Sequence, residues 1–306
     1  MEWTVKDIPR LDNKTIIVTG GNSGLGYEDV KAFASKGAKV IMACRSLERG
    51  KEAANRIKEE LSQEVDIQVM KLDLASLESI ADFCDEFLKE NNRLDILMNN
   101  AGIMTTPYGL TEDGFEQQFG VNHLGHFALT AQLFDIIKQT KGARIVNISS
   151  NAHKSGVMNF YNLMYKDGYG YSPMRAYAKS KLANLYFTYE LQRKINHSIF
   201  DIKVLAAHPG ISNTSLSRHL EESKLFDKVG WILEKTVQSA YDGALSGIRA
   251  ATDENAVGGE YYGPDGFMEL KGKPIIVTSN ELSHSKINAK RLWKISEQLT
   301  KIKFDI

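Results

Sequence analysis

The sequence predicts an α/β fold, namely one doubly wound parallel sheet with helices on both faces. Short apolar runs alternate with longer helical patterns along the 306-residue chain. The runs are almost continuously apolar and rich in β-branched residues, which is typical of strands buried on both faces of a parallel sheet. A glycine-rich turn follows the first run, and a helical pattern begins there. The runs are TIIVTG (15–20), AKVIMACR (38–45), DIQVMKLDL (66–74), LDILMNNAG (94–102), ARIVNIS (143–149) and DIKVLAAHPG (201–210).

The segments between the runs are predicted helices. Ser46 and Ser76 precede two of them at the N-cap position, where a serine side chain accepts a hydrogen bond from an unpaired backbone N–H. Two segments depart from the alternation. Residues 151–175 form an insertion with no sustained period, and residues 211–234 are a predicted substrate lid after the sixth strand.

The end of the sequence predicts a last group of short elements. From Gly258 onward we expect a short strand at GGEYYG, a Gly/Pro-rich loop and an amphipathic helix over about residues 286–301. No internal repeat, low-complexity tract or linker interrupts the sequence. We therefore expect a single domain over residues 1–306.

The composition excludes several kinds of partner. Lys and Arg together number 38, as do Asp and Glu, so no strong field favours nucleic acid or an anionic membrane. Cys44 and Cys84 lie in apolar segments, which indicates reduced core residues of a cytoplasmic protein. The first 14 residues have neither a signal-peptide core nor the roughly 20 apolar residues of a membrane span, and later apolar runs are strand-length. We expect no integral membrane segment and a small uncharged or amphiphilic partner.

A glycine-rich motif joins the first predicted strand to the first predicted helix. Glycines permit a tight turn and let the backbone approach a pyrophosphate, and a helix N-terminus favours negative charge. The alternative is an ordinary glycine-rich turn, but the strand-turn-helix context favours dinucleotide binding. The motif residues are Thr19, Gly20, Gly21, Asn22, Ser23, Gly24, Leu25 and Gly26.

The end of the second predicted strand indicates which dinucleotide binds. An NAD enzyme commonly carries Asp or Glu at this place for the ribose 2′-hydroxyl. This sequence instead reads Ala43-Cys44-Arg45-Ser46, in which Arg45 offers a planar set of donors suited to a 2′-phosphate. We therefore expect NADP(H) as the cofactor rather than NAD(H). A surface arginine at a helix start is the alternative.

Tyr177 and Lys181 form the candidate catalytic pair. They lie four residues apart at the start of a helical pattern, so their side chains share one helix face. A general acid or base works best with a pKa near the working pH, and a neighbouring ammonium lowers the pKa of a phenol toward it. Found alone, the pair is more often part of a solvated helix face.

The motifs together resemble the short-chain dehydrogenase/reductase family. In that family a Thr-Gly-x-x-x-Gly-x-Gly turn, Asn-Asn-Ala-Gly, an Asn within a helix, a Ser after a strand and Tyr-x-x-x-Lys follow one another. The resemblance covers nearly the whole chain and implies a Rossmann fold and an NADP(H)-dependent oxidoreductase. The matching residues are Thr19 to Gly26, Asn99 to Gly102, Asn122, Ser149 and Ser150, Tyr177 and Lys181, followed by Pro209, Gly210 and Thr214.

The resemblance implies a role for each matched position. Tyr177 would transfer a proton to or from the substrate oxygen, and Lys181 would lower its pKa and hold the nicotinamide ribose. Ser150, rather than Ser149, would hydrogen-bond the substrate oxygen, and Asn122 would anchor a water in a proton relay. Found alone, each would be an ordinary cap, turn or surface residue. The remaining positions would hold the cofactor: Asp73 with its neighbour Leu74 at the adenine, Asn99, Asn100, Ala101 and Gly102 along the cleft, and Pro209, Gly210 and Thr214 at the nicotinamide amide.

Within the family, several segments are similar to retinol dehydrogenases and to light-dependent protochlorophyllide reductase: ACRSLERGKEA, RIVNISSNAH, the insertion, AHPG and GGEYYGPDG. The resemblance implies conversion between a carbonyl and an alcohol on a hydrophobic aldehyde, ketone or retinoid-like substrate. Reduction of an activated C=C bond and a non-enzymatic NADP(H)-sensing regulatory protein are the alternatives. A homodimer or homotetramer through the helices around Asn122 and Tyr177 is also implied.

Two further features are not assigned to a site. His123 and His126 have no third ligand at a useful spacing, so helix-packing histidines are favoured over zinc and no metal is expected. The apolar residues of the insertion are equally compatible with a lipophilic pocket and with packing of the loop onto the body. They are Met158, Phe160, Tyr161, Met164, Tyr165, Tyr169 and Tyr171.

Overall fold

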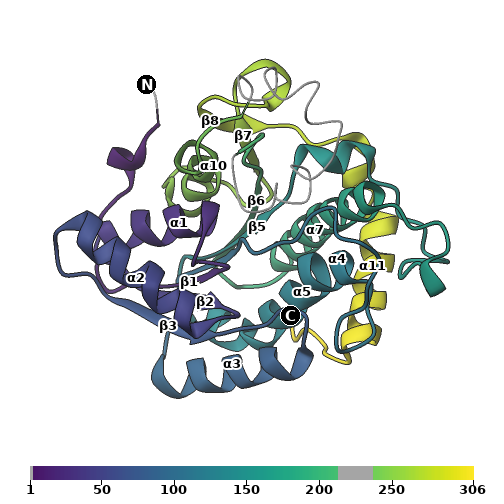
Figure 1. Ribbon diagram of the computed structural model, residues 1–306, viewed down its shortest axis with the longest axis horizontal. Helices are drawn as coiled ribbons and strands as arrows, with labels where there is room; N and C mark the ends of the chain where they lie inside the picture. Colours follow the sequence, from purple (N-terminus) through teal and green to yellow (C-terminus); the bar gives the residue numbers. More distant parts are fainter. Residues whose placement is uncertain (1–2, 213–236) are drawn as a thin grey trace.

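The computed structural model describes residues 3–212 and 237–306, and it has the predicted α/β fold (Figure 1). One eight-stranded sheet has the order β3-β2-β1-β4-β5-β6-β7-β8. Strands β1 to β7 are parallel, whereas β8 runs antiparallel to β7. The strands are β1 (Thr15–Thr19), β2 (Lys39–Cys44), β3 (Ile67–Lys71), β4 (Ile96–Asn99), β5 (Ala143–Ile148), β6 (Ile202–Ala207), β7 (Tyr261–Pro264) and β8 (Pro274–Val277). The predicted lid, apart from Ile211 and Ser212, lies outside the described residues.

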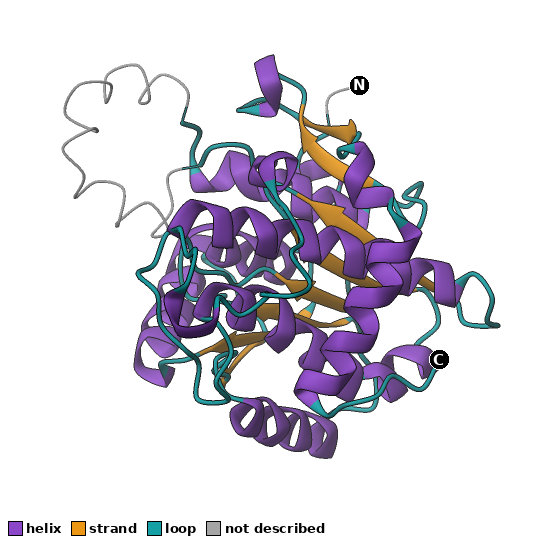
Figure 2. Cartoon of the chain, turned by 90° about the vertical axis from the view of Figure 1, so that its right-hand side faces the viewer, coloured by secondary structure: helices purple, strands orange, loops and turns teal. Residues whose placement is uncertain are grey.

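Helices cover both faces of the sheet (Figure 2). Alternate side chains of a strand point to opposite faces. Ile16 and Val18 of β1 therefore join the apolar cluster under α1, α2 and α10, whereas Ile17 joins the cluster under α3, α5 and α7. The helices are α1 (Gly24–Ser35), α2 (Leu47–Leu61), α3 (Leu77–Glu90), α4 (Gln117–Phe119), α5 (Gly125–Gln132), α6 (Phe134–Gln139), α7 (Pro173–Ile195), α10 (Ala240–Thr252) and α11 (Lys286–Thr300).

Both predicted N-caps are confirmed. The Ser46 hydroxyl oxygen accepts a hydrogen bond from the Arg49 backbone N–H at 3.3 Å, and α2 begins at the next residue. The Ser76 hydroxyl oxygen accepts a hydrogen bond from the Ser79 backbone N–H at 3.3 Å, and α3 begins at Leu77. Each cap fixes where its helix leaves the end of the preceding strand.

The C-terminal region differs from the prediction at one place. The strand expected at GGEYYG is β7, and the helix expected near the end is α11. The Gly/Pro-rich loop expected between them was wrong in part, because it contains β8. This strand lies at the edge of the sheet, where Ile275 and Ile276 are 39% and 53% exposed. Because neither of its faces is fully buried, its short sequence carries no clear period.

Helix α11 packs along α7, as its position in Figure 1 shows. The Trp293 ring lies 5.3 Å from the Phe127 ring and 5.9 Å from the Phe187 ring, measured between centroids. His123 Nε2 lies 2.9 Å from the Ser296 hydroxyl oxygen. The chain's own last helix therefore covers part of the surface near α5 and α7 that was expected to mediate association.

The insertion forms loops with two short 3₁₀ turns, at Asn151–Ser155 and Lys166–Gly168. Several of its apolar residues pack onto the body of the protein, which is one of the two roles considered above. Met158, Phe160 and Met164 pack against a buried cluster under α7 and α11. In contrast, the exposed Tyr161 and Tyr169 side chains extend from the loop.

Candidate active site

The candidate site lies where the strand order reverses, since β1 has β2 on one side and β4 on the other. In doubly wound sheets, ligands bind at the carboxyl ends of the strands beside this switch point. A small hollow at this edge brings together residues from α1, the segment after β4, β5, the turn after β6 and α10. Its lining includes Leu25, Asn100, Ile148, Pro209 and Gly243.

The glycine-rich turn has the backbone conformation that a nucleotide-binding turn requires. Gly20 and Gly24 have φ of +67° and +56°, which side-chain-bearing residues rarely adopt. A Cβ atom on Gly26 would lie 2.4 Å from the Gly20 carbonyl oxygen, so only glycine fits. Ser23 precedes α1 but makes no side-chain cap, which leaves the first N–H groups of the helix available for an anion. Asn22 is half-buried beside this turn.

Thr19 fastens the glycine-rich turn to the segment after β4. Its hydroxyl oxygen accepts hydrogen bonds from the backbone N–H groups of Asn100 and Ala101, both at 2.9 Å. The Asn100 side-chain amide donates to the Thr19 carbonyl at 2.9 Å. Asn99 is different: it is buried, and its amide donates to Asn147 instead, so its side chain does not line the hollow.

Arg45 and Asp73 follow two neighbouring strands. Ala43 of β2 pairs with Thr19 of β1, and Arg45 follows Ala43 by two residues. Arg45 therefore lies near the glycine-rich turn that follows Thr19. Its side chain is exposed and forms no ion pair with any residue in the described ranges. The Asp73 carboxylate accepts the Ala75 N–H at 2.9 Å, and the neighbouring Leu74 is buried.

Ser150, Tyr177 and Lys181 converge at the end of β5. The Tyr177 side chain is buried, and its phenol forms a hydrogen bond with Ser150. Lys181 Nζ lies 5.7 Å from the centroid of the Tyr177 ring and donates to the Ile148 carbonyl at 2.9 Å. The Ser149 hydroxyl instead donates to the Lys181 carbonyl at 2.9 Å and braces α7. The two serines therefore have different partners.

The expected effect of Lys181 on Tyr177 is not what the geometry gives. Burial raises the pKa of Tyr177 to about 12, and the hydrogen bond to Ser150 opposes this rise only in part. Burial also lowers the pKa of Lys181 to about 8. Both shifts have the same cause, because a low-dielectric surrounding disfavours the charged form of each group. The phenol therefore keeps its proton at neutral pH.

Asn122 lies in a π-helical turn, Gly120–Leu124, that joins α4 to α5. Its side chain accepts the Ile103 N–H at 2.8 Å and donates to the Ile103 carbonyl at 2.9 Å. It also donates to the Ser180 hydroxyl at 2.9 Å. A Cβ on Gly102 would lie 3.3 Å from Asn122 Oδ1 and 3.5 Å from Lys181 Nζ. Asn122 and Lys181 thus both lie next to Gly102.

The turn after β6 is held by the C-terminal region. Gly210 has a φ of +66°, and a Cβ there would lie 2.3 Å from the Leu270 carbonyl oxygen. The Ile211 N–H donates to this carbonyl at 2.7 Å. Pro209 lines the hollow, whereas Thr214 lies outside the described residues.

Two buried charged residues were missed from the sequence. Asp29 of α1 lines the hollow, and its Oδ1 has no hydrogen-bond partner among the described residues; burial raises its pKa. Lys179 lies between Tyr177 and Lys181 in sequence but on another helix face. Its ammonium donates to the Leu163 carbonyl of the insertion and lies 4.0 Å from the Tyr165 ring centroid. An acid or a lysine within an otherwise apolar helix pattern was the available signal for each.

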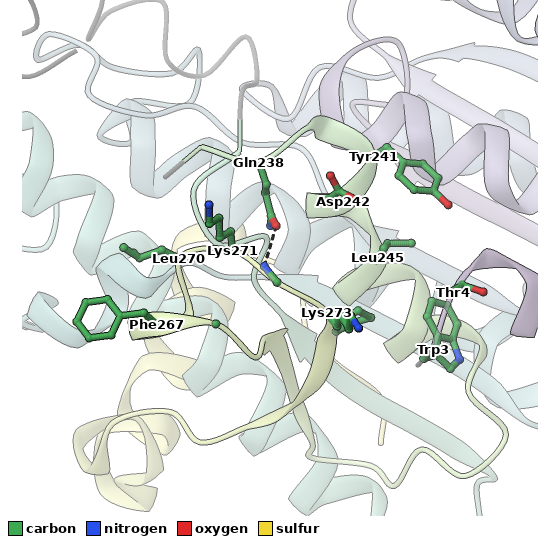
Figure 3. Close-up of a pocket in the computed structure, with 13 residues that line it drawn as sticks. Trp3, Thr4, Gln238, Tyr241, Asp242, Leu245, Phe267, Leu270, Lys271 and Lys273 are labelled. Carbon is green, nitrogen blue, oxygen red and sulfur yellow. Dashed lines mark hydrogen bonds between the residues drawn. The ribbon is translucent and has the colours of Figure 1, made fainter. Parts of the chain in front are cut away.

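A second, larger cavity of about 620 Å³ lies between α10 and the loop before β8 (Figure 3). Gln238 joins it to the Pro209 turn, because its amide donates to the Pro209 carbonyl and its oxygen accepts the Gly272 N–H at 3.1 Å. Its apolar lining includes Trp3, Leu245 and Phe267. None of the candidate catalytic side chains line this cavity or the small hollow.

Comparison with known proteins agrees with this geometry. A profile of the short chain dehydrogenase family matches residues 14–225. The chain belongs to the short-chain dehydrogenase/reductase family. Retinol dehydrogenase 14 from mouse is 40% identical over 307 residues, covering 95% of this chain and 87% of the relative. Human retinol dehydrogenase 13 is 39% identical over 297 residues, covering 94% and 85%.

Solved structures agree with the fold of this short-chain dehydrogenase. An uncharacterized protein from Mycobacterium paratuberculosis has a TM-score of 0.82 and 37% identity, covering 100% of both chains. A Shigella flexneri short chain dehydrogenase, solved as a complex with NADP, has a TM-score of 0.64 and 20% identity, covering 83% of this chain and 98% of the other. The second likeness concerns the fold alone.

The expectation of an oxidoreductase in the retinol dehydrogenase-like subgroup is therefore confirmed. Within the described part of this short-chain dehydrogenase, no helix has both the length and the apolarity to cross a membrane. His123 and His126 are buried in the helix core and are not part of any group of three or more potential metal ligands there.

Proposed function

We propose that this protein is an NADP(H)-dependent reductase that interconverts a carbonyl and an alcohol, with Tyr177 as the general acid and base. The observation that carries the proposal is the convergence of Ser150, Tyr177 and Lys181 at the end of β5, where Lys181 lies next to Gly102 of the segment that contacts the glycine-rich turn. A nucleotide-binding fold has no need of a buried phenol paired with a serine and a lysine. Proton transfer to or from a substrate oxygen does need such a group of side chains.

The chemistry follows from the protonation states of these groups. When bound, the reduced nicotinamide supplies the hydride that reduces the carbonyl carbon. The Tyr177 phenol, kept neutral by burial, gives its proton to the carbonyl oxygen as that oxygen becomes an alkoxide. Ser150 donates a hydrogen bond to the same oxygen and stabilises its developing charge. Lys181 stabilises the resulting phenolate, and one hydride and one proton together complete the alcohol.

The cofactor choice rests on Arg45 and on the turn before it. The guanidinium is exposed at the start of α2, with no described acidic partner to compete for it, and no carboxylate ends β2. Residues that fit the rest of the dinucleotide are Gly20, Asn22, Ser23, Gly24, Leu25 and Gly26 at the pyrophosphate, Asp73 and Leu74 at the adenine, and Asn100, Ala101, Gly102, Pro209 and Gly210 along the cleft. Preference for NADP(H) favours reduction as the working direction.

The substrate class is a hydrophobic aldehyde or ketone, including retinoid-like compounds. Relatives named retinol dehydrogenases share 39–40% identity with this chain. The insertion adjoins the catalytic helix, because Lys179 and the Leu163 carbonyl hold it there. Its exposed Tyr161 and Tyr169 supply apolar surface for such a substrate. A homodimer or homotetramer and a cytoplasmic location remain predictions.

The test is activity on a panel of aldehydes and ketones, followed by the loss of NADPH absorbance. We expect Tyr177→Phe to lose at least about a hundredfold in kcat, the usual contribution of a positioned acid. Tyr189→Phe is the matched control, since this buried phenol of the same helix bonds to Ser279 and Ser283, away from the candidate catalytic residues, and should leave kcat unchanged. Equal activity of wild type and Tyr177→Phe on every reduced carbonyl would overturn the assignment.

The same experiment separates the two alternatives. Product analysis by mass spectrometry and NMR distinguishes an alcohol from a saturated carbonyl, which identifies reduction of a C=C bond. If wild type and Tyr177→Phe are equally inert on every substrate while both bind NADPH tightly, an NADP(H)-sensing regulatory protein replaces the enzyme.

A further inference from the structure

We propose that His126 is a positioning residue that braces the cofactor-side loop at residues 100–103 from both of its ends. This inference rests on the proposed function. Thr19 holds the start of this loop through Asn100 and Ala101, and Asn122 holds its end through Ile103. His126 is the side chain that joins these two anchors.

Hydrogen bonds fix which nitrogen of His126 carries the proton. The Nδ1 atom lies 3.1 Å from the Asn122 backbone carbonyl, which is an acceptor only, so Nδ1 must be the donor. The neutral ring then presents Nε2 as an acceptor, 2.9 Å from the Thr19 hydroxyl oxygen. Thr19 then gives its one hydroxyl proton to Nε2, the nearer of two acceptors, since the Met98 carbonyl lies at 3.3 Å, and it accepts the N–H groups of Asn100 and Ala101.

The surroundings of His126 keep this tautomer neutral. The side chain is 2% exposed, and burial lowers its pKa to about 4, with the nearby Lys181 ammonium acting in the same direction. A neutral histidine can donate at one nitrogen and accept at the other at once, which no apolar side chain of similar size can do.

The loop that His126 braces passes next to the catalytic lysine. Gly102 stands between the two anchors, and a Cβ there would lie 3.5 Å from Lys181 Nζ. A shift of either anchor would therefore change the shape of the cleft wall beside Lys181. We call the bond from His126 to Thr19 the Thr19 arm and the bond from His126 to Asn122 the Asn122 arm. We expect the first to affect cofactor binding and the second to affect catalysis. The Thr19 arm holds the segment that faces the glycine-rich turn, and the Asn122 arm holds the segment beside the catalytic pair.

Two conservative substitutions of His126 each remove one of its two hydrogen bonds and keep the other. The amide nitrogen of His126→Asn falls where Nδ1 stands, so this variant keeps the bond to Asn122 and loses the bond to Thr19. The terminal amide of His126→Gln reaches the position of Nε2, so it keeps the bond to Thr19 and loses the bond to Asn122. His126→Leu loses both. The readouts are the NADPH Kd from fluorescence titration and kcat at saturating NADPH.

We expect a crossed pattern. His126→Asn should weaken NADPH binding about three- to tenfold and leave kcat nearly unchanged, as expected for one buried hydrogen bond. His126→Gln should lower kcat by about the same factor and leave the Kd nearly unchanged. His126→Leu should show both losses. The matched control is His123→Asn, because His123 is equally buried but its Nε2 bonds to Ser296 of α11, and the loss of this bond should change only the melting temperature.

Two results would overturn the proposal: unchanged Kd and kcat in all three variants, or losses in both quantities that simply follow the melting temperature. Failure of the proposed function would look different. In that case wild type would reduce no carbonyl, whereas the NADPH Kd of His126→Asn against His126→Gln would still test the Thr19 arm.

Discussion

Arg45 should decide the choice between the two nicotinamide dinucleotides. It lies two residues beyond Ala43, the register partner of Thr19, at the start of α2. The Ser46 hydroxyl oxygen already accepts the Arg49 N–H, but its own proton remains available to a phosphate. We therefore expect Arg45→Asp to remove a planar pair of donors and to place a negative charge where the 2′-phosphate would bind.

The magnitude follows from the exposure of Arg45. A hydrogen bond to a charged group contributes about 1.5–3 kcal/mol, which is about 10- to 150-fold in a dissociation constant, and the exposure of Arg45 disfavours the upper end of this range. Arg45→Asp should therefore raise the Kd for NADPH about 10- to 100-fold and change the Kd for NADH less than about threefold. Isothermal titration calorimetry with both cofactors measures the ratio, and Arg45→Ala separates the lost donors from the added charge.

Lys58→Asp is the matched control, because it makes the same change of charge on an exposed residue in the last turn of α2. Its effect on NADPH should be small, since the site of the change is distant from the β2 end and screened by salt. Equal losses for NADPH and NADH in Arg45→Asp, or tighter NADH binding by the wild type, would refute the phosphate assignment.

Three other predictions concern the turn, the proton donor and the base of the sheet. Gly26→Ala should weaken NADPH binding about tenfold or more, because its Cβ would lie 2.4 Å from the Gly20 carbonyl oxygen; unchanged titration curves would contradict this. Because Tyr177 has a pKa of about 12, its phenol stays protonated from pH 6 to about pH 9. The kcat/KM for reduction should be flat from pH 6 to about pH 7 and should fall as Lys181 loses its proton near pH 8, whereas that for oxidation, which needs the phenolate, should rise from pH 6 to about pH 7; a reduction rate that rises would be inconsistent. Asp95→Ala should lower the free energy of unfolding by about 3 kcal/mol in urea titrations without changing kcat, since the buried carboxylate accepts two hydrogen bonds from Arg93, and a cost below about 1 kcal/mol would show that they contribute little.

The sheet could be predicted from the sequence because its central strands are buried on both faces. A run such as TIIVT has no polar face, and the helices beside it begin at serines whose role is local. Strand β8 could not be predicted in this way. Its residues lie at an edge of the sheet and are held by pairing with β7. This pairing cannot be inferred from the sequence of β8 alone.

The candidate site could be predicted in part. Tyr177 and Lys181 share a face because helix geometry places residues four apart together. The sequence could not give the pKa of Tyr177, because burial depends on what packs over it from elsewhere in the chain. The roles of Lys179 and His126 were missed for the same reason: each bonds to a segment far away in sequence, the Leu163 carbonyl and the Thr19 hydroxyl.

The central claim is that the phenol, the serine hydroxyl and the reactive ring of the cofactor meet at one place. A crystal structure with NADP(H) and a bound carbonyl or alcohol tests it most directly. The account predicts the Tyr177 and Ser150 oxygens within hydrogen-bond distance of the substrate oxygen, about 2.6–3.2 Å, with the nicotinamide beside them and Arg45 at the 2′-phosphate. A nicotinamide bound away from Tyr177, or a substrate oxygen held by other groups, would contradict it.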